Sequence, residues 1–394
     1  MQKIERVENL MRFVLSPGIG SIGMARLLRH FGDSDAILGA SEERLREVDL
    51  RPAQVAAVLR AGKIDPRPEL DAVAAKGIDL LPYDDPAYPA ALLNIADPPF
   101  LLYVKGALET GDQQSLGIVG ARVCSNYGRE QCARLSAGLA RVGYCIVSGM
   151  ARGIDTCAHN GALAAGGRTV AFVGCGLNHV YPPENRDLMA EIAAHGAVIS
   201  EFPLDAVPAA QNFPRRNRLI AGFALGVLVV EASEKSGSLI TARQALDMGR
   251  EVFAVPGRID QDTSSGCHAL IREGAVLVRN MDDILSELPV MQVGKEVAAE
   301  KPTPEESPSV PGAGAKKERG VAAVNGAPMV KTAVAVTPEQ QRVLDALAAD
   351  SEVHVDALAA SLDVPANALL ATLLSLELRG LIRQSPGKYF SLRR

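Results

Sequence analysis

Residues 212–218 combine arginines with an aromatic ring in the order Asn-Phe-Pro-Arg-Arg-Asn-Arg. A guanidinium group binds a phosphate through two parallel hydrogen bonds, and an exposed ring can stack on a nucleotide base. The segment therefore predicts a nucleic-acid contact in which Phe213 meets a base and Arg215 or Arg216 holds phosphates.

The end of the same segment also fits a structural role. Asn217 and Arg218 directly precede the apolar run 219–230. A polar residue at the start of a buried helix can cap and anchor it. For these two residues the DNA contact and the structural role both stay open.

The chain as a whole is acidic, with a formal net charge of -5 and a pI near 5.8 over 394 residues. Such a protein has no global basic field that draws it onto nucleic acid. Any nucleic-acid site must therefore be a local basic patch. The length allows about two or three domains with proper cores.

Cysteine spacing and hydropathy indicate the compartment. The six cysteines, at positions 124, 132, 145, 157, 175 and 267, form no C-x-x-C pair and lie near no histidine doublet with metal spacing. We expect reduced core thiols, no metal and no cofactor. Residues 1–15 mix charged with apolar side chains, unlike a signal peptide, and the longest apolar run is too short to span a bilayer. The pattern predicts a cytoplasmic protein without a membrane partner.

The central region predicts an α/β fold. Short, apolar, β-branched runs alternate there with helical patterns, at residues 116–120, 145–148, 170–174, 197–201, 227–231, 252–255 and 275–278. Parallel strands need crossover connections, and helices in those connections cover both faces of the sheet. We therefore expect a Rossmann-like, doubly wound parallel sheet over residues 80–288.

The N-terminal region, residues 1–79, shows helical patterns. Residues 15–20 read Leu-Ser-Pro-Gly-Ile-Gly and precede an apolar helix that ends at Gly32. This order is similar to a helix-hairpin-helix, whose hairpin amides can hold a DNA phosphate. It fits an ordinary helical hairpin equally well. The expectation is a helical domain that resembles a SAM or helix-hairpin-helix domain.

The C-terminal region predicts a linker and a small domain. Residues 289–336 are rich in Pro, Ala, Gly, Glu and Lys without periodicity, which is typical of a flexible linker. Helical patterns then occupy residues 339–349, 355–361 and 365–379, before strand patterns at residues 380–383 and 388–392. This order predicts a winged helix over residues 337–394. Its third helix carries little basic charge, so a protein contact is favoured over DNA reading, and both stay open.

Glycine-rich turns mark the expected binding edge of the sheet. Ligands of such sheets bind outside the carboxyl ends of the strands, where loops and helix N-termini converge. The turns lie at residues 120–122, 148–153, 174–176 and 231–238. Small residues expose backbone amides, and Arg122 and Arg152 add guanidinium groups that suit phosphates. Glu201 and Glu231 also end strands, and either an acid–base role or ion pairing with these arginines stays open for them.

These turns lack the motifs of nucleotide-dependent enzymes. Neither G-x-G-x-x-G nor G-x-x-x-x-G-K-[ST] is present in them, so neither a nicotinamide nor an ATP site is expected. Asp155 and His159 lie one helical turn apart, but no serine or cysteine nucleophile stands in a fixed relation to them. We expect His159 to be structural and the protein not to be an enzyme.

A set of motifs in this region resembles the DNA-processing protein A family (DprA, also called Smf). The motifs are Gly120-Ala121-Arg122 with Tyr127-Gly128, Ser148-Gly149-x-Ala151-Arg152-Gly153-Ile154-Asp155-x-x-Ala158-His159, Tyr181-Pro182-x-Glu184-Asn185, Phe213-Pro214-x-Arg216-Asn217-Arg218 and Ser236-Gly237-Ser238-Leu239-x-Thr241-Ala242. Each is weak alone, but their order and spacing are specific as a set.

The resemblance implies a non-enzymatic protein that binds single-stranded DNA, protects incoming DNA and loads the RecA recombinase during natural transformation. It also implies a homodimer formed through the Rossmann-like domain. The family often has a basic residue three positions before the phenylalanine, where this chain has Ala210. DNA binding is therefore expected either to depend more on Arg215, Arg216 and Arg218 or to be weaker.

The resemblance also assigns roles at the strand ends. It gives Arg122 a backbone phosphate and Phe213 a base, and the glycine-rich turns supply amides. The residues expected to contact DNA are Gly120, Ala121, Arg122, Ser148, Gly149, Ala151, Arg152, Gly153, Asn212, Phe213, Arg215, Arg216, Asn217, Arg218, Lys235, Gly237 and Ser238.

Two alternatives use the same crevice. Related Rossmann-like folds hydrolyse nucleoside monophosphates at a Pro-Gly-Gly-x-Gly-Thr-x-x-Glu turn, whereas residues 236–244 here carry Ser-Gly-Ser and end without a carboxylate. That departure weighs against a hydrolase. A sensor that binds a small nucleotide shares every feature of the site and stays open.

Overall fold

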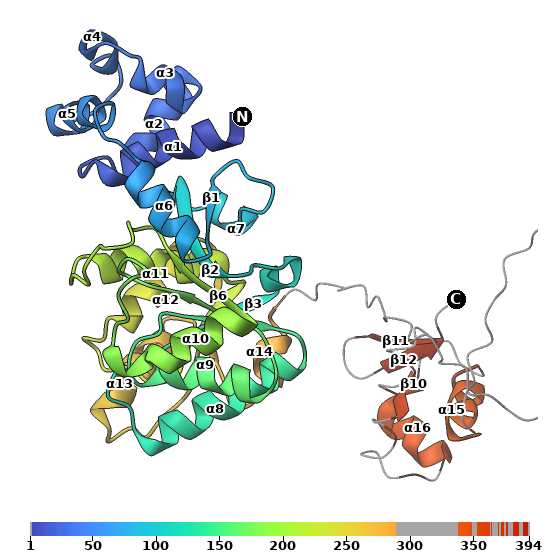
Figure 1. Cartoon of the computed structure of the whole chain (residues 1–394). Helices are drawn as coiled ribbons and strands as arrows, with labels where there is room; N and C mark the ends of the chain where they lie inside the picture. The colour runs from blue at the N-terminus through green and yellow to red at the C-terminus, as the bar shows by residue number, and fades with distance from the viewer. Residues whose placement is uncertain are drawn as a thin grey trace, which may run out of the picture. The chain divides into compact units, whose positions relative to one another are not determined.

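Figure 1 shows the chain as a computed structural model, which describes residues 2–288, 338–348, 353–362, 364, 369, 372–373, 376, 381–385 and 389–392. The chain divides into two compact units, Met1–Ala299 and Glu300–Arg394. The predicted linker, residues 289–336, lies outside the described residues. None of the described helices is long and apolar enough to cross a membrane.

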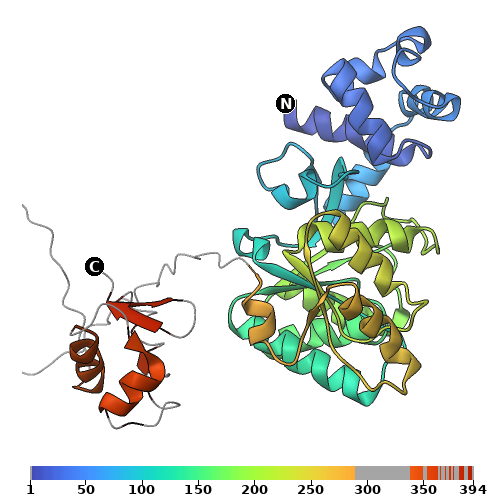
Figure 2. The same cartoon turned by 180° about the vertical axis from the view of Figure 1, so that it is seen from behind.

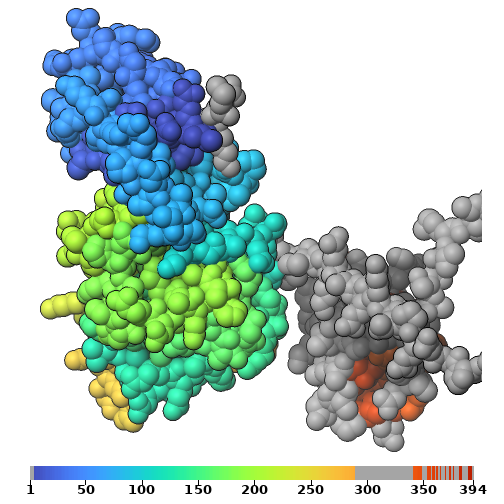
Figure 3. Space-filling model, viewed as in Figure 1, coloured from blue at the N-terminus to red at the C-terminus, as the bar shows by residue number. Residues whose placement is uncertain are grey.

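The first unit begins with a helical region, as predicted. Its helices are α1 (Gln2–Leu15), α2 (Ser21–Phe31), α3 (Ser34–Leu38), α4 (Glu42–Leu45), α5 (Pro52–Ala61) and α6 (Arg67–Ala75). They bury apolar stripes in one core that includes Met24 and Leu27. The hydroxyl of Ser16 donates to the carbonyl oxygen of Ala57 at 2.7 Å, which fixes the α1–α2 turn on α5. Figure 3 shows this region as a blue lobe at one end of the unit.

A mixed sheet follows, with the strand order β1-β2-β6-β5-β4-β3-β7-β8-β9. The strands are β1 (Ile78–Pro82), β2 (Leu101–Gly106), β3 (Ser115–Val119), β4 (Cys145–Ser148), β5 (Thr169–Phe172), β6 (Gly196–Ser200), β7 (Gly226–Val229), β8 (Glu251–Ala254) and β9 (Val276–Leu277). The strands from β3 to β9 pair in parallel with their neighbours in this group. The predicted Rossmann-like sheet is thus confirmed, with each predicted strand present.

The strands β1 and β2 extend the predicted sheet at one edge. β2 pairs antiparallel with both β1 and β6. Pro82 ends β1, and Pro98 and Pro99 lie just before β2, so turn residues interrupt the strand pattern in the sequence. The buried Tyr103 of β2 donates its hydroxyl to a carboxylate oxygen of Glu69 on α6 at 3.1 Å. β2 therefore joins the helical region to the sheet.

Helices cover both faces of this sheet. On one face lie α8 (Asn126–Arg141), α9 (Ile154–Ala164) and α14 (Asp282–Leu285), and on the other α11 (Asn212–Phe223), α12 (Ser238–Asp247) and α13 (Asp262–Arg272). Side chains alternate between the two cores along each strand, as Val227 and Leu228 of β7 do. Helix α10 (Arg186–His195) packs against β6, and α7 (Ala90–Leu93) against α11. Figures 1 and 2 show the two faces from opposite sides.

The second unit has the predicted winged-helix order. It contains α15 (Pro338–Ala348), α16 (Val355–Leu362) and a sheet of order β10-β12-β11, formed by β10 (Val353–His354), β11 (Ile382–Ser385) and β12 (Tyr389–Leu392). Val343, Leu358 and Phe390 share its core. Most of the predicted third helix, residues 365–379, lies outside the described residues.

Candidate functional site

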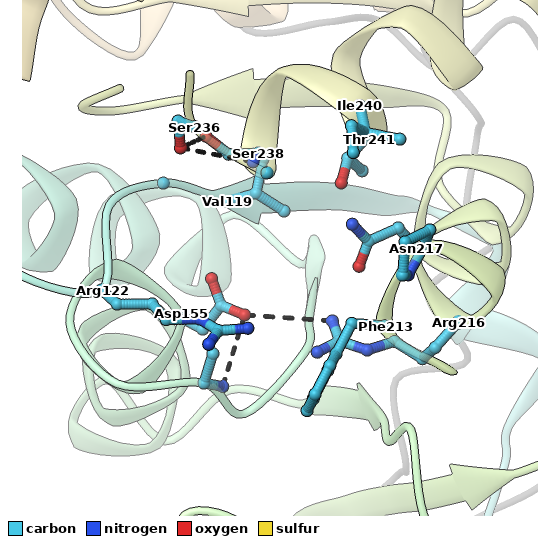
Figure 4. A pocket seen from close by; sticks show the side chains of 14 residues that line it. Val119, Arg122, Asp155, Phe213, Arg216, Asn217, Ser236, Ser238, Ile240 and Thr241 are labelled. Carbon is cyan, nitrogen blue, oxygen red and sulfur yellow. Dashed lines mark hydrogen bonds and ion pairs between the residues drawn. The ribbon is translucent and has the colours of Figure 1, made fainter. Parts of the chain in front are cut away.

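A cavity of about 270 Å³ opens where the strands β3 and β7 end. This edge of the sheet is the one that the glycine-rich turns predicted. The cavity is lined by Val119, Gly120, Arg122, Ala151, Asp155, Phe213, Pro214, Arg216, Asn217, Ser236, Gly237, Ser238, Ile240 and Thr241. Figure 4 shows these side chains between the first turns of α11 and α12 and the loops after β3 and β4.

A buried ion pair forms the floor of the cavity. Nη1 of Arg216 lies 4.0 Å from Oδ2 of Asp155, and their side chains are only 5% and 8% exposed. The same carboxylate oxygen accepts from the amides of Gly149 and Ala151, at 3.2 and 3.4 Å. Burial raises the pKa of Asp155 and lowers that of Arg216, because it disfavours both charges.

The Arg216 guanidinium is incompletely paired. Its Nε is buried and has no hydrogen-bond partner among the described residues. At 4.0 Å its contact with Asp155 is longer than a hydrogen bond. A buried cation in this condition favours an additional anion, so the floor of the cavity is suited to a phosphate or carboxylate.

Gly149 makes room for this guanidinium. A Cβ added at Gly149 would lie 1.4 Å from Nη1 of Arg216. The next residue, Met150, has a φ of 55°, a conformation that side-chain-bearing residues rarely adopt. The turn after β4 is therefore shaped around the arginine that α11 places against it.

Phe213 lies between two other groups at the cavity. Its ring centroid is 5.5 Å from that of Tyr181, at an interplanar angle of 44°. Cζ of Arg122 lies over the ring, 5.1 Å from the centroid, in cation–π geometry. Phe213 is half-buried, whereas Arg122 is exposed. One face of the ring is thus covered by an exposed side chain.

The carboxylates at the strand ends, Glu201 and Glu231, do not pair with Arg122 or Arg152. Glu231 accepts from the amide of Ser125 at 2.9 Å and from its hydroxyl at 3.2 Å, at the start of α8. Glu201 pairs with Arg218, with 2.5 Å between Oε2 and Nη2. Among the described residues, neither carboxylate pairs with the arginines of the first two glycine-rich turns.

The first turn of α12 forms the opposite rim. Gly237 is its N-cap residue and makes no side-chain hydrogen bond to the helix within the described chain. The hydroxyls of Ser236 and Ser238 lie 2.7 Å apart. The amide of Ser238 donates to the hydroxyl of Ser236 at 3.3 Å, and the amides of Leu239 and Ile240 donate to the carbonyl oxygens of Ser236 and Gly237. This rim therefore offers an anion the positive end of the helix dipole and two hydroxyls. Lys235 is exposed beside it.

About half of the residues expected to contact DNA line the cavity. These are Gly120, Arg122, Ala151, Phe213, Arg216, Asn217, Gly237 and Ser238. Arg152 is exposed nearby and forms a bidentate pair with Glu184, in which Nη2 lies 3.0 Å from Oε2. Ser148 is buried, and its hydroxyl donates to the carbonyl oxygen of Ile118 at 2.6 Å.

The remaining expected residues support the site or point elsewhere. Gly149 and Gly153 shape the turn after β4, and the amide of Ala121 donates to the carbonyl oxygen of Glu231 at 2.7 Å. Asn212 is buried at the start of α11. Arg215 and Arg218 do not line this cavity, because their positions on α11 direct them away from Phe213 and Arg216.

Other lining residues were missed in the sequence. Ile240 and Thr241 follow Gly237 by three and four positions, so helical periodicity places them on the same side of α12. The role of Asp155 as the partner of Arg216 has no signal in the sequence. His159 is structural as predicted, since it is fully buried, its Nδ1 lies 2.7 Å from the hydroxyl of Thr169, and burial lowers its pKa to about 3.

Comparisons with known proteins agree with one another. The family described as DNA recombination-mediator protein A matches residues 79–289, and the DprA winged helix domain matches residues 327–388. Protein Smf of Synechocystis sp. is 35% identical over 396 residues, which cover 95% of this chain and 96% of that protein. DNA processing protein DprA of Bacillus subtilis is 42% identical over 225 residues, 57% of this chain and 76% of that protein.

A solved structure supports the same relation. The X-ray structure of DNA processing protein A (DprA) from Streptococcus pneumoniae has a TM-score of 0.64 and 36% sequence identity to this chain. The match covers 72% of this chain and 99% of that chain.

Replacement of Gly149 tests the packing beneath the cavity. In Gly149→Ala the new methyl group displaces the Arg216 guanidinium and leaves Asp155 buried without its partner. We expect a loss of about 3 to 5 kcal/mol in the free energy of unfolding, measured by urea titration of the full chain. Gly237→Ala is the matched control, because a Cβ there meets no atom within 4 Å and the backbone φ is -64°. Equal stabilities of the two variants would contradict the role of Gly149.

Proposed function

This chain belongs to the DNA recombination-mediator protein A family, and on that basis we propose that it binds single-stranded DNA and mediates recombination without catalysing a reaction. The observation that carries the proposal is the meeting of Arg122, Phe213 and Arg216 in one cavity. Guanidinium groups beside an aromatic ring are what a groove for single strands requires.

The charges in the cavity favour one phosphate. Arg122 and Arg216 face it with two positive charges, while the single lining carboxylate, Asp155, is already engaged by Arg216 and by backbone amides. The first-turn amides of α12 add a positive partial charge from the opposite rim. This local positive site lies on a protein of net charge -5, so binding depends on the cavity rather than on a broad basic surface.

The ring contact supports recognition of an unpaired base. Arg122 covers one face of Phe213 at 5.1 Å. When its guanidinium turns to a phosphate, that face becomes available to a base. The phosphate contact and the stacking contact are therefore coupled through one side chain.

The size of the cavity supports single strands over duplex. A volume of about 270 Å³ is below the usual range of ligand pockets, roughly 300–1,000 Å³, and is suited to a single nucleotide. In a duplex the bases are stacked and paired, and their faces are not presented to a protein ring. Contacts of this kind read no sequence.

A nucleotide-binding sensor is the second candidate, because a cavity for one nucleotide also fits a free one. A hydrolase is less favoured. Such enzymes carry a glutamate after the turn, and this chain has Gln244 at that position. The side-chain amide of Gln244 donates to the carbonyl oxygen of Pro214 at 3.3 Å. Titration with nucleoside monophosphates, together with an assay for released base and released phosphate, separates these alternatives from DNA binding.

We further propose that the protein acts as a homodimer that protects incoming DNA and loads RecA during natural transformation. The family description as a recombination mediator and the relatives' names as DNA processing proteins support this role. In the winged-helix unit, contact with a protein is favoured over contact with DNA.

The RecA proposal predicts faster filament formation on single-stranded DNA that is already covered by a single-strand-binding protein. The comparison is RecA with and without this protein, followed by electron microscopy or by ATP hydrolysis. Sedimentation of the protein alone tests the dimer. No acceleration at saturating protein would exclude the loading role while leaving DNA binding intact.

Arg122→Ala tests the phosphate contact. Because a hydrogen bond to a charged group contributes about 1.5–3 kcal/mol, we expect oligo-dT affinity to fall by at least tenfold at low salt. The exposed Arg141 at the end of α8 provides the control, since Arg141→Ala makes the same charge change away from the cavity. Wild-type affinity in Arg122→Ala would overturn the site assignment.

Phe213→Leu tests stacking, because leucine keeps apolar volume but has no ring. We expect a loss of about 1–3 kcal/mol in binding, with an unchanged dependence on salt, since stacking releases few counterions. Phe213→Trp, which keeps a ring, is expected to retain binding. If Phe213→Leu binds as well as the wild type, the ring serves only the core.

A further inference from the structure

A second crevice lies against the other side of α11. It has a volume of about 370 Å³ and separates α11 from the turn between α1 and α2. Residues that line it include Gly20, Ser21, Arg51, Asp97, Arg215 and Arg218. At 100° per residue, Arg215 and Arg218 project roughly opposite to Phe213 and Arg216.

The N-terminus of α2 opens into this crevice. Its N-cap residue, Gly20, has an extended backbone with φ -87° and ψ 172°, and no side chain caps the helix in the described part of the chain. Ser21, Ile22 and Gly23 form the first turn and line the crevice. The first amides of a helix have no intrahelical acceptor, so they favour an anion here.

The buried side chain of Arg218 independently points to a missing acceptor. Its side chain is 6% exposed, its Nε lies 2.8 Å from Oδ2 of Asp97, and its Nη2 lies 2.5 Å from Oε2 of Glu201. Both Nη1 and Nε are buried and have no hydrogen-bond partner among the described residues, and Nη1 also lacks an ion-pair contact there. Buried donors are nearly always satisfied in folded proteins, so an unpaired one beside a cavity favours an acceptor bound in that cavity.

Two exposed arginines add charge at the entrance. The Arg215 guanidinium lies over the ring of Phe202 at 5.1 Å and 3.6 Å from Oε1 of Glu201. Arg51 is exposed on the opposite wall, at the start of α5. Together with Arg218 they bring three guanidinium groups to the crevice, against the two carboxylates of Asp97 and Glu201.

We propose that this crevice holds a second backbone phosphate of the DNA strand that occupies the first cavity. The inference rests on the proposed function. An α-helix with its side chains is about 10–12 Å across, so one extended strand can reach both sides of α11 by passing over its N-terminal end. The turn between α1 and α2 then becomes part of the DNA path.

Substitution of Gly20 tests this without disturbing the fold. A Cβ at Gly20 meets no atom within 4 Å, and its extended backbone suits any N-cap residue. Aspartate and asparagine both cap helices well, so neither Gly20→Asp nor Gly20→Asn is expected to lower the melting temperature. They differ in one negative charge at the crevice.

The expected result depends on the length of the DNA. For a long oligo-dT, Gly20→Asp should weaken binding about tenfold and reduce the salt slope by about 0.7, the value for one lost phosphate contact on a single strand. Gly20→Asn should bind at least threefold more tightly than Gly20→Asp. For a dT mononucleotide, which fills the first cavity alone, both variants should bind like the wild type.

A second pair of variants removes charge instead of adding it. Arg51→Ala should lower the salt slope for the long oligo-dT, whereas Arg29→Ala, at the far end of α2, should not. The inference is overturned if Gly20→Asp and Arg51→Ala bind the long oligo-dT like the wild type while Arg122→Ala does not. It is also overturned if inorganic phosphate binds to the crevice but the long oligo-dT does not displace it. Failure of the wild type to bind any single strand would instead overturn the proposed function.

Discussion

The contact between Arg216 and Asp155 connects the parts of the site that are far apart in the sequence. Asp155 belongs to α9 and holds the amides of the turn after β4, while Arg216 comes from α11 on the other face of the sheet. Both charges are buried, so each is costly without the other. Their attraction therefore fixes α11 against the turn, and with it the ring of Phe213. The incomplete pairing of Arg216 leaves positive potential at the bottom of the cavity for an anion.

Much of the fold could be predicted because strands buried on both faces read as short apolar runs. The strands from β3 to β9 have this pattern, and the glycine-rich turns after them located the cavity. β1 and β2 escaped prediction, since the prolines beside them look like turn signals and their antiparallel pairing needs no helical crossover. The division of the chain into an N-terminal and a sheet domain at residue 79 stays a prediction, because both lie in one compact unit.

The arginines of residues 212–218 are adjacent in the sequence but do not form one cluster in the structure. Adjacent positions on a helix point about 100° apart, so charges that are neighbours in sequence separate in space. Arg216 lines the first cavity, whereas Arg215 and Arg218 line the second crevice. Helical periodicity could have separated them in advance. The partners of these arginines could not have been predicted, because Asp97, Asp155 and Glu201 meet them only through the tertiary fold.

Glu69 has a consequence for how the protein would select its ligand. Its carboxylate oxygen accepts from the hydroxyl of Tyr103 on β2 and, at 2.7 Å, from the amide of Leu204 after β6, so α6 is fastened to the sheet. Through Ile19, the α1–α2 turn belongs to the same apolar core as α6 and β2, and this packing sets its spacing from α11. The first cavity and the second crevice are then two phosphate sites at a constant spacing. A DNA strand that binds at both sites must be extended between them. Along the proposed path, the protein therefore selects for an extended backbone and not for particular bases.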